Sequence, residues 1–321
     1  MFRRTLLSAS LAAALPAGAQ AQAWPQRPVR ILVPYPPGSG TDIIGRILAE
    51  RLQLAWGQPV VVENRPGAGG TLGTEVGARA QPDGHTLLIA DTGPLAIAPS
   101  LYARLGYDPV ADFAPITLLA RLAFVLAVYP GVAVQDAMQF VALARGQPGR
   151  IAYASVGNGS FTHLAMELFA AAESISLNHV PYRGSAPALN DVVGGQVRAL
   201  FVNTLSSVDL IRSGRLRALA IGSRARLPVL PDVPTLTEAL GKPMTAEAWF
   251  GLLAPRGTPG EIVARIAADV AALAADPAQR TRMEATGAEI AVTSPDAFAA
   301  MIRAEGTRWA PIVRASGARV D

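Results

Sequence analysis

Residues 29–48 read VRILVPYPPGSGTDIIGRIL, which predicts a strand, a glycine-rich loop and a helix in that order. β-Branched residues alternate over Val29–Val33, and the apolar residues of Ile43–Leu48 recur with helical spacing. This order places a helix N-terminus at the carboxyl end of a strand. Free amide groups and the positive end of the helix dipole then suit an anion without any cationic side chain.

Two interpretations of this loop stay open. Ser39 and Thr41 are residue types that cap helices in ordinary turns. They also carry hydroxyls that can donate to a ligand carboxylate, beside Gly38 and Gly40, which let the backbone approach a ligand. Asp42 fits both interpretations, as a helix cap or as an acceptor for a ligand's donor group.

The same order of elements recurs along the chain. Strands are predicted over residues 59–62 and 86–90, and the loops at 38–42, 64–70 and 91–93 would share one edge of a parallel sheet. A later strand, residues 150–154, is followed by SVGNGSFTH (155–163) and an amphipathic helix. We therefore expect an α/β fold in which two helix N-termini face one cleft.

Two long apolar stretches predict strands that cross between domains. The first covers residues 113–129 and the second begins at Trp249, which we expect to pack at the crossing. We expect domain 1 to comprise residues 24–124 and 249–321, and domain 2 to comprise residues 125–248. The helices predicted over 261–275, 277–286 and 295–316 should pack back on the first domain.

The first residues are typical of a secretory signal. Arg3 and Arg4 precede an apolar stretch at residues 6–15 and small-residue cleavage sites before Trp24. That stretch is too short to span a bilayer as a helix. We predict a signal peptide over residues 1–23 and a periplasmic mature protein. A lipid-anchored form is excluded, because the chain has no cysteine.

Net charge argues against nucleic acid as a partner. The chain carries a formal +4, and loss of Arg3 and Arg4 with the signal leaves about +2. The arginines are scattered along the sequence, whereas nucleic-acid-binding proteins cluster them.

Little in the sequence supports catalysis, a metal or a cofactor. There are three histidines (His85, His163 and His179), and none belongs to a cluster with metal-ligand spacing. The segment GNGSF at residues 157–161 is not a nucleophile elbow, and no P-loop lysine follows a glycine run. The glycines at 67, 69 and 73 have the spacing GxGxxxG, which departs from a dinucleotide fingerprint.

Other polar residues have two interpretations each. His163 at a helix start is either a cap or packing residue, or a donor to a ligand carboxylate. Tyr182 and Arg183 lie in a loop before a helix. For Arg183 we favour a solvated side chain over a ligand role. For Tyr182 we do not favour the corresponding structural role, a half-buried ring, over a ligand role. Asn203 ends a strand that should point into the cleft, or it forms a strand-end turn.

Eight motifs together resemble the substrate-binding receptors of tripartite tricarboxylate transporters, the Bug family. In order they are PYPPGSGTD, VENRPGAGG, DGHTLL, PSLYARLGYDPVADFAPITL, YASVGNGSFTHLAMELF, HVPYRGSAPALNDVVGGQV, LPDVPTLTEAL and WFGLLAPRGTP, and the resemblance runs from Trp24 to the C-terminus. The resemblance implies a two-domain periplasmic binding protein of type II-like Venus-flytrap fold. Each domain would be a mostly parallel sheet flanked by helices, with two crossing strands between them.

The resemblance also implies which residues grip the ligand. Loops from both domains would hold a carboxylate, partly through backbone amides and water. The residues that match these loops are Ser39, Gly40, Thr41, Asp42, Thr92, Ser155, Gly157, Asn158, Ser160, Thr162, His163, Tyr182, Gly184 and Asn203. Val202 stands where the family usually has an aspartate, so we expect a ligand without an ammonium or hydroxyl group at that end. Thr71 and the pair Thr92–Gly93 are smaller departures.

The implied function is a monomeric receptor, not an enzyme, that binds a small organic acid and delivers it to a membrane permease. No metal or cofactor is expected. A receptor that docks a membrane sensor kinase is the alternative of another class, and an exported enzyme is a more remote one.

Overall fold

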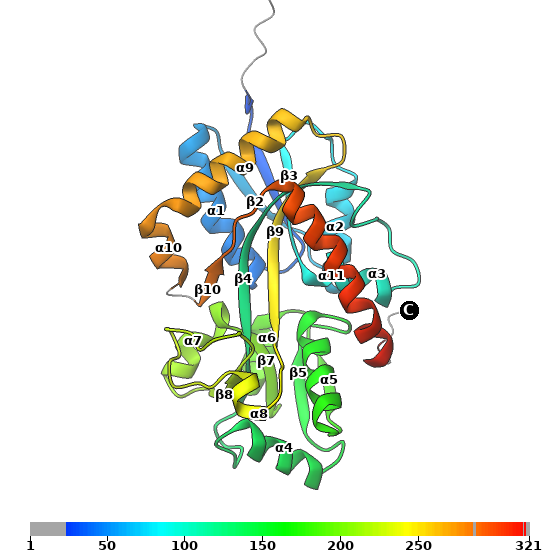
Figure 1. The fold of residues 1–321 in the computed structure, drawn as a ribbon, viewed down its shortest axis with the longest axis vertical. Helices are drawn as coiled ribbons and strands as arrows, with labels where there is room; N and C mark the ends of the chain where they lie inside the picture. Colours follow the sequence, from blue (N-terminus) through cyan, green and yellow to red (C-terminus); the bar gives the residue numbers. More distant parts are fainter. Residues whose placement is uncertain (1–23, 285–286, 317, 319–321) are drawn as a thin grey trace, which may run out of the picture.

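The structure, a computed structural model, describes residues 24–284, 287–316 and 318. The predicted signal peptide, residues 1–23, lies outside the described residues. Two lobes share one long sheet of strand order β2-β1-β3-β9-β4-β7-β5-β6, and β8 and β10 also pair with β4. Figure 1 shows β4 and β9 running side by side through both lobes, with β2 and β3 in one and β5, β7 and β8 in the other. The expected two-domain α/β fold with two crossing strands is confirmed.

The first lobe begins with the strand–loop–helix unit that the sequence predicts. Val29–Val33 forms β1, which pairs in parallel with β2 and β3, and α1 starts at Gly40. Its other elements before the crossing are β2 (Val60–Asn64), the short helix η1 (Ala68–Gly70), α2 (Thr71–Ala78), β3 (Thr86–Asp91), η2 (Gly93–Ile97) and α3 (Ala98–Leu101). α1 ends at Trp56 and is closed by Gly57 in the left-handed conformation that favours glycine.

The crossing strands are antiparallel to each other and to their neighbours. β4 covers Phe113–Val128 and β9 covers Glu247–Pro255, close to the predicted stretches. β3 pairs with β9 on one side, and β7 pairs with β4 on the other. Trp249 is 1% exposed and packs against Phe298 of α11, so it lies in the crossing as predicted.

The second lobe repeats the parallel arrangement, because β5 lies between β6 and β7 and pairs in parallel with both. Its elements are α4 (Ala137–Gly146), β5 (Ala152–Ser155), α5 (Phe161–Glu173), β6 (Asn178–Pro181), α6 (Ser185–Val193), β7 (Ala199–Asn203), α7 (Thr204–Arg212), β8 (Arg217–Ile221) and α8 (Leu236–Leu240). The strands β5 and β7 end at Ser155 and Asn203, so both polar side chains lie at one edge of this half of the sheet.

The C-terminal elements return mainly to the first lobe. They are α9 (Gly260–Ala275), α10 (Pro277–Glu284), β10 (Ala288–Ile290) and α11 (Pro295–Ser316). α11 packs on η2 and α3 as expected, and it also reaches α5 of the second lobe, where Trp309 contacts Phe161 edge to face (Figure 1). The domain boundaries near residues 124 and 249 stay a prediction.

Candidate ligand-binding cleft

A cleft lies between the lobes, at the carboxyl ends of β1, β3, β5 and β7. The space between its walls that no protein atom fills, counted out into the open solvent, is about 450 Å³. The first lobe supplies one set of lining residues and the second lobe faces it with another. The lining residues are Tyr35, Ser39, Gly40, Thr41, Asp91, Phe124, Val156, Ser160, Phe161, Thr162, Ser185, Asn203, Ala248 and Phe250.

The loop before α1 forms the first wall. Ser39 is the N-cap of the helix, with φ −70° and ψ 159°, and its hydroxyl accepts a hydrogen bond from the amide of Asp42. Gly38 precedes it in the left-handed conformation, at φ +81°. The Asp42 carboxylate accepts from the Gly38 amide at 2.9 Å and from Arg46 at 2.9 Å, and Asn64 donates to its other oxygen.

Asp42 is therefore occupied within its own loop. Burial alone would raise the pKa of this carboxyl, but hydrogen bonds from Arg46, Gly38 and Asn64 outweigh burial and lower it below the ordinary value. Asp42 does not line the cleft. Its capping role is the one that the geometry supports, and a contact with the ligand stays a prediction.

The loop before α5 forms the second wall on the same plan. Ser160 is the N-cap, with φ −65° and ψ 160°, and its hydroxyl accepts from the amide of His163. Gly159 precedes it at φ +69°. The Thr162 hydroxyl accepts a hydrogen bond from the amide of Val156 at 3.0 Å, which closes the loop. The two helix N-termini that the sequence predicts for one cleft are present.

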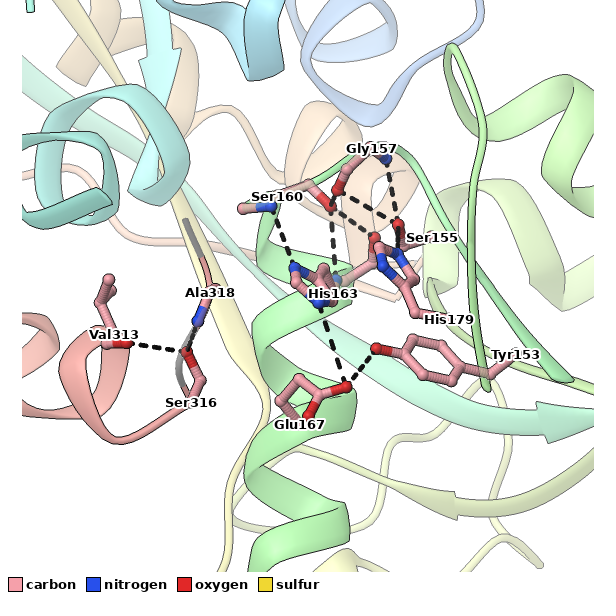
Figure 2. Close-up of polar contacts among 12 residues, drawn as sticks. Tyr153, Ser155, Gly157, Ser160, His163, Glu167, His179, Val313, Ser316 and Ala318 are labelled. Carbon is pink, nitrogen blue, oxygen red and sulfur yellow. Dashed lines mark hydrogen bonds and ion pairs between the residues drawn. The ribbon is translucent and has the colours of Figure 1, made fainter. Parts of the chain in front are cut away.

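Behind this second loop lies a pair of stacked histidines (Figure 2). The rings of His163 and His179 are 3.9 Å apart and nearly parallel, at an interplanar angle of 8°. His163 accepts from the Gly159 amide through Nδ1, at 3.0 Å, and its Nε2 lies 4.0 Å from Glu167. Since Nδ1 accepts, the proton of the neutral ring is on Nε2.

Two further bonds fix this group. The Nε2 atom of His179 lies 2.6 Å from the Ser155 hydroxyl, and the Tyr153 hydroxyl donates to Glu167 at 2.5 Å. Burial lowers the pKa of His163, although Glu167 opposes the shift. Burial, and then the neighbouring His163, lower the pKa of His179 to about 4. Both rings are therefore neutral at pH 7, and they support the loop from behind.

Asp91 and Tyr35 both line the cleft, and neither was predicted from the sequence as a ligand residue. Asp91 ends β3 and is 9% exposed. Its Oδ1 accepts from the Gly93 amide at 2.9 Å and from the Tyr35 hydroxyl at 3.0 Å, and its Oδ2 accepts from the Thr41 hydroxyl at 3.3 Å. Burial outweighs these hydrogen bonds and raises the pKa of Asp91 to about 6. An acidic residue at the end of a buried strand was the available signal.

The cleft contains six of the predicted ligand residues and leaves out eight. Those that line it are Ser39, Gly40, Thr41, Ser160, Thr162 and Asn203. Asn203 caps α7 through its Oδ1, and its Nδ2 would lie 3.4 Å from a Cβ built on Gly40 of the other lobe. The residues outside the lining are Asp42, Thr92, Ser155, Gly157, Asn158, His163, Tyr182 and Gly184, and their ligand roles stay predictions.

Most of those eight have partners elsewhere. Thr92 is fully buried and accepts from the Trp249 amide, while Tyr182 donates to Asp191 at 2.5 Å. Gly184 is the N-cap position of α6, where an added Cβ would lie 3.2 Å from Pro36. This approach, like that of Asn203 to Gly40, brings the two lobes into contact across the cleft.

Among the residues that the structure describes, no group of three or more histidine, aspartate or glutamate side chains has the arrangement of a metal site. In the same part of the chain, no helix combines the length and the apolar character needed to cross a membrane.

A sequence model described as the tripartite tricarboxylate transporter family receptor matches residues 44–318. Protein BugT of Bordetella pertussis is 38% identical over 310 residues, which cover 96% of this chain and 95% of BugT. A Rhodopseudomonas palustris protein, Rpa4515 with adipate, is similar at a TM-score of 0.90 and 34% identity, covering 93% of this chain and 100% of that one. MatC of the same organism, with bound malate, gives a TM-score of 0.84 at 34% identity, covering 90% and 100% of the two chains.

Proposed function

Because this chain belongs to the tripartite tricarboxylate transporter receptor family, we propose that its cleft binds a small carboxylate for delivery to a membrane permease of that system. The observation that carries the proposal is the pair of helix N-termini, capped by Ser39 and Ser160, at one cleft. Two similar structures, Rpa4515 with adipate and MatC with bound malate, are complexes with carboxylates.

Helix ends supply what a carboxylate needs. The first amides of a helix lack backbone acceptors, and the helix dipole adds a partial positive charge. Among the described lining residues there is no lysine, arginine or histidine, so oriented amides and hydroxyls replace a cation. Lobe closure around the ligand would exclude water and strengthen these hydrogen bonds.

Closure is coupled to the ligand through the contacts between lobes. Asn203 faces Gly40, and Gly184 faces Pro36, so both sides of the cleft come within van der Waals reach. A ligand that contacts both helix ends binds the closed arrangement more tightly than an open one. It therefore shifts the population toward closure, and a permease that binds the closed form can distinguish loaded from empty receptor.

We extend the proposal to location and assembly. The receptor acts in the periplasm, residues 1–23 are its export signal, and it works as a monomer. Size-exclusion chromatography with light scattering on the protein from Trp24 onward tests the last point. A dimer that persists at micromolar concentration would contradict it.

We also propose that the protein is a receptor without turnover. Ser155 and His179 are separated by 2.6 Å, as in a nucleophile–base pair. Ser155 is only 1% exposed, however, and its hydroxyl also contacts the Gly157 backbone. Its low exposure and these backbone contacts argue against a role as a nucleophile. Incubation with activated esters should give no more hydrolysis than His179→Gln protein; a rate that this variant abolishes would contradict the proposal.

Thermal-shift titration tests the carboxylate itself. Mature protein is titrated with mono-, di- and tricarboxylates and, as matched controls, with the neutral amides of the same acids. A ligand at one hundred times its dissociation constant adds about 2.7 kcal/mol to the free energy of unfolding. We expect acids to raise the midpoint and their amides not to. Equal shifts for an acid and its amide would overturn the role of the helix ends.

A further inference from the structure

The charge of the cleft has one source among the described residues. Of the side chains that line the cleft, only Asp91 is ionisable as an acid or base near neutral pH. The other polar groups are hydroxyls, an amide and backbone amides, and the remaining walls are apolar, with Phe124, Phe161 and Phe250 among them. A cleft suited to an anion thus also contains an acid.

Asp91 still has room to accept a hydrogen bond. A carboxylate oxygen accepts about two hydrogen bonds. The Oδ1 atom has two donors, the Gly93 amide at 2.9 Å and the Tyr35 hydroxyl at 3.0 Å. The Oδ2 atom has one, the Thr41 hydroxyl, at the longer distance of 3.3 Å. The spare capacity is therefore on Oδ2, the oxygen beside Thr41, which itself lines the cleft.

A purely structural role for Asp91 requires only one of its two carboxylate oxygens. Holding Tyr35 and the turn at Gly93 requires Oδ1, and an asparagine would provide that oxygen without a charge. Asp91 is buried, at only 9% exposed, and among the described residues no cation pairs with its carboxylate. Burying an unpaired carboxylate is costly unless a donor compensates it. A ligand carboxylate nearby would add repulsion unless the ligand also brought a donor.

We propose that Asp91 is a specificity residue whose Oδ2 accepts a hydrogen bond from a hydroxyl or ammonium group of the bound acid. The inference rests on the proposed function, since the helix N-termini must hold the carboxylate of the same ligand. The receptor then prefers a hydroxy or amino acid over the acid that lacks the donor. Discrimination of this kind is strong, because the unsubstituted acid leaves a buried acceptor without its partner.

Matched pairs of acids test this on the unmodified protein. The pairs are malate against succinate, mandelate against phenylacetate, and glutamate against glutarate, each measured by calorimetric titration at pH 7.5. We expect the donor-bearing member of each pair that binds to be at least about tenfold tighter, as for other hydrogen bonds to charged groups. α-Methoxyphenylacetate, which keeps the oxygen but loses the proton, should bind no better than phenylacetate.

Two variants assign the preference to Asp91. Asp91→Asn should reduce the ratio within a pair to below about threefold while it keeps or improves binding of the unsubstituted acid. Asp269→Asn is the matched control, because Asp269 also accepts from an aromatic donor, Trp56, but lies in α9 outside the cleft. This control should keep the wild-type ratio.

Each other outcome overturns the inference. Equal affinities within every pair, a ratio that survives Asp91→Asn, or methoxy acid that binds as tightly as mandelate would each show that no donor is accepted at Oδ2. In those cases the carboxylate receptor itself stands. If no acid of any pair or of the wider panel binds to folded protein, the proposed function fails, and this inference fails with it. The methoxy comparison needs no variant, so it decides even if Asp91→Asn does not fold.

Discussion

The two loops that face each other across the cleft are built on one plan from different residues. Gly38-Ser39-Gly40-Thr41-Asp42 precedes and begins α1, and Gly159-Ser160-Phe161-Thr162-His163 precedes and begins α5. In each, a left-handed glycine precedes a serine N-cap. The side chain three residues after the serine reaches back to that glycine's amide, at 2.9 Å from Asp42 and 3.0 Å from His163.

The difference lies in what stands behind each loop. Asp42 is charged and is compensated by Arg46 and Asn64. His163 is neutral and stacks on a second neutral ring, His179. The first loop is therefore maintained by electrostatics that persist over most of the pH range, whereas the second depends on two rings remaining uncharged. The same backbone can thus present amides to a ligand in two lobes that respond differently to packing changes and to pH.

The largest expected difference comes from the two left-handed glycines. A Cβ at Gly159 would lie 1.7 Å from Leu101 of the first lobe, whereas a Cβ at Gly38 meets nothing within 4 Å. Both Gly→Ala changes should lower the free energy of unfolding by about 1–2 kcal/mol, because alanine disfavours the left-handed conformation. Only Gly159→Ala should lower it by roughly 1–3 kcal/mol more, because its Cβ overpacks the site. The added clash is between lobes, so it opposes closure as well as folding.

Urea unfolding and ligand titration of the two variants measure this difference. We expect Gly38→Ala to bind its ligand nearly as wild type, and Gly159→Ala to bind it at least about tenfold more weakly, since about 1.4 kcal/mol is tenfold. Equal losses in both variants would show that the lobes do not approach at Leu101 in solution.

The second prediction concerns the acid next to the first loop. The pKa of Asp91 is raised to about 6 by burial, whereas that of an unfolded aspartate is 3.8. The folded state therefore binds more protons between these values, and stability is full below pH 3.8 and is lost as pH rises through 6. Asparagine does not titrate. The stability of Asp91→Asn relative to wild type should thus increase by up to about 3 kcal/mol from pH 4 to pH 7.

Chemical denaturation of both proteins at the two pH values measures that increase. A stability difference for Asp91→Asn that is the same at pH 4 and pH 7 would mean that Asp91 titrates as in the unfolded chain.

The histidine pair behind the second loop should give the opposite sign. The pKa of His179 is lowered to about 4 by burial and by His163, against 6.5 when unfolded. The unfolded state then binds more protons between these values, so stability is full above pH 6.5 and is lost as pH falls towards 4. We expect a loss of about 2 kcal/mol, a value reduced for the partial exposure of the ring.

Replacing His179 by glutamine isolates this effect, because the amide can still contact Ser155 but does not titrate. The titratable groups that face His179 from neighbouring elements include the neutral ring of His163 and, beyond it, the carboxylate of Glu167, both on α5. The variant should lose less stability than wild type between pH 6.5 and pH 4.5 in denaturant titrations. Parallel curves for the two proteins would contradict the neutral stacked pair.

Sequence reasoning succeeded where the interactions are local. Glycine, serine and threonine before an apolar helix predict both helix N-termini, since the contacts that begin a helix span only about three residues. It failed where partners are distant in the chain. Asp91 meets Thr41 from 50 positions away, and its direction depends on how β1 and β3 pair. The expectation from Val202, a ligand without a donor group at that end, stays a prediction, and position 202 alone could not show that another carboxylate, Asp91, lines the cleft.

The smallest predicted effect concerns the two N-cap serines, which differ in whether the hydroxyl proton already has an acceptor within the protein. Both accept from the helix, so each Ser→Ala change should reduce stability by about 1 kcal/mol. The Ser160 hydroxyl also donates to the Gly157 carbonyl at 2.7 Å, whereas that of Ser39 finds no acceptor among the described residues. Ser160→Ala should therefore cost more stability, and Ser39→Ala should cost more ligand affinity, by several-fold. Melting curves and titrations of both variants test this exchange of roles; a larger affinity loss in Ser160→Ala would mean that the second loop, not the first, supplies the donating hydroxyl.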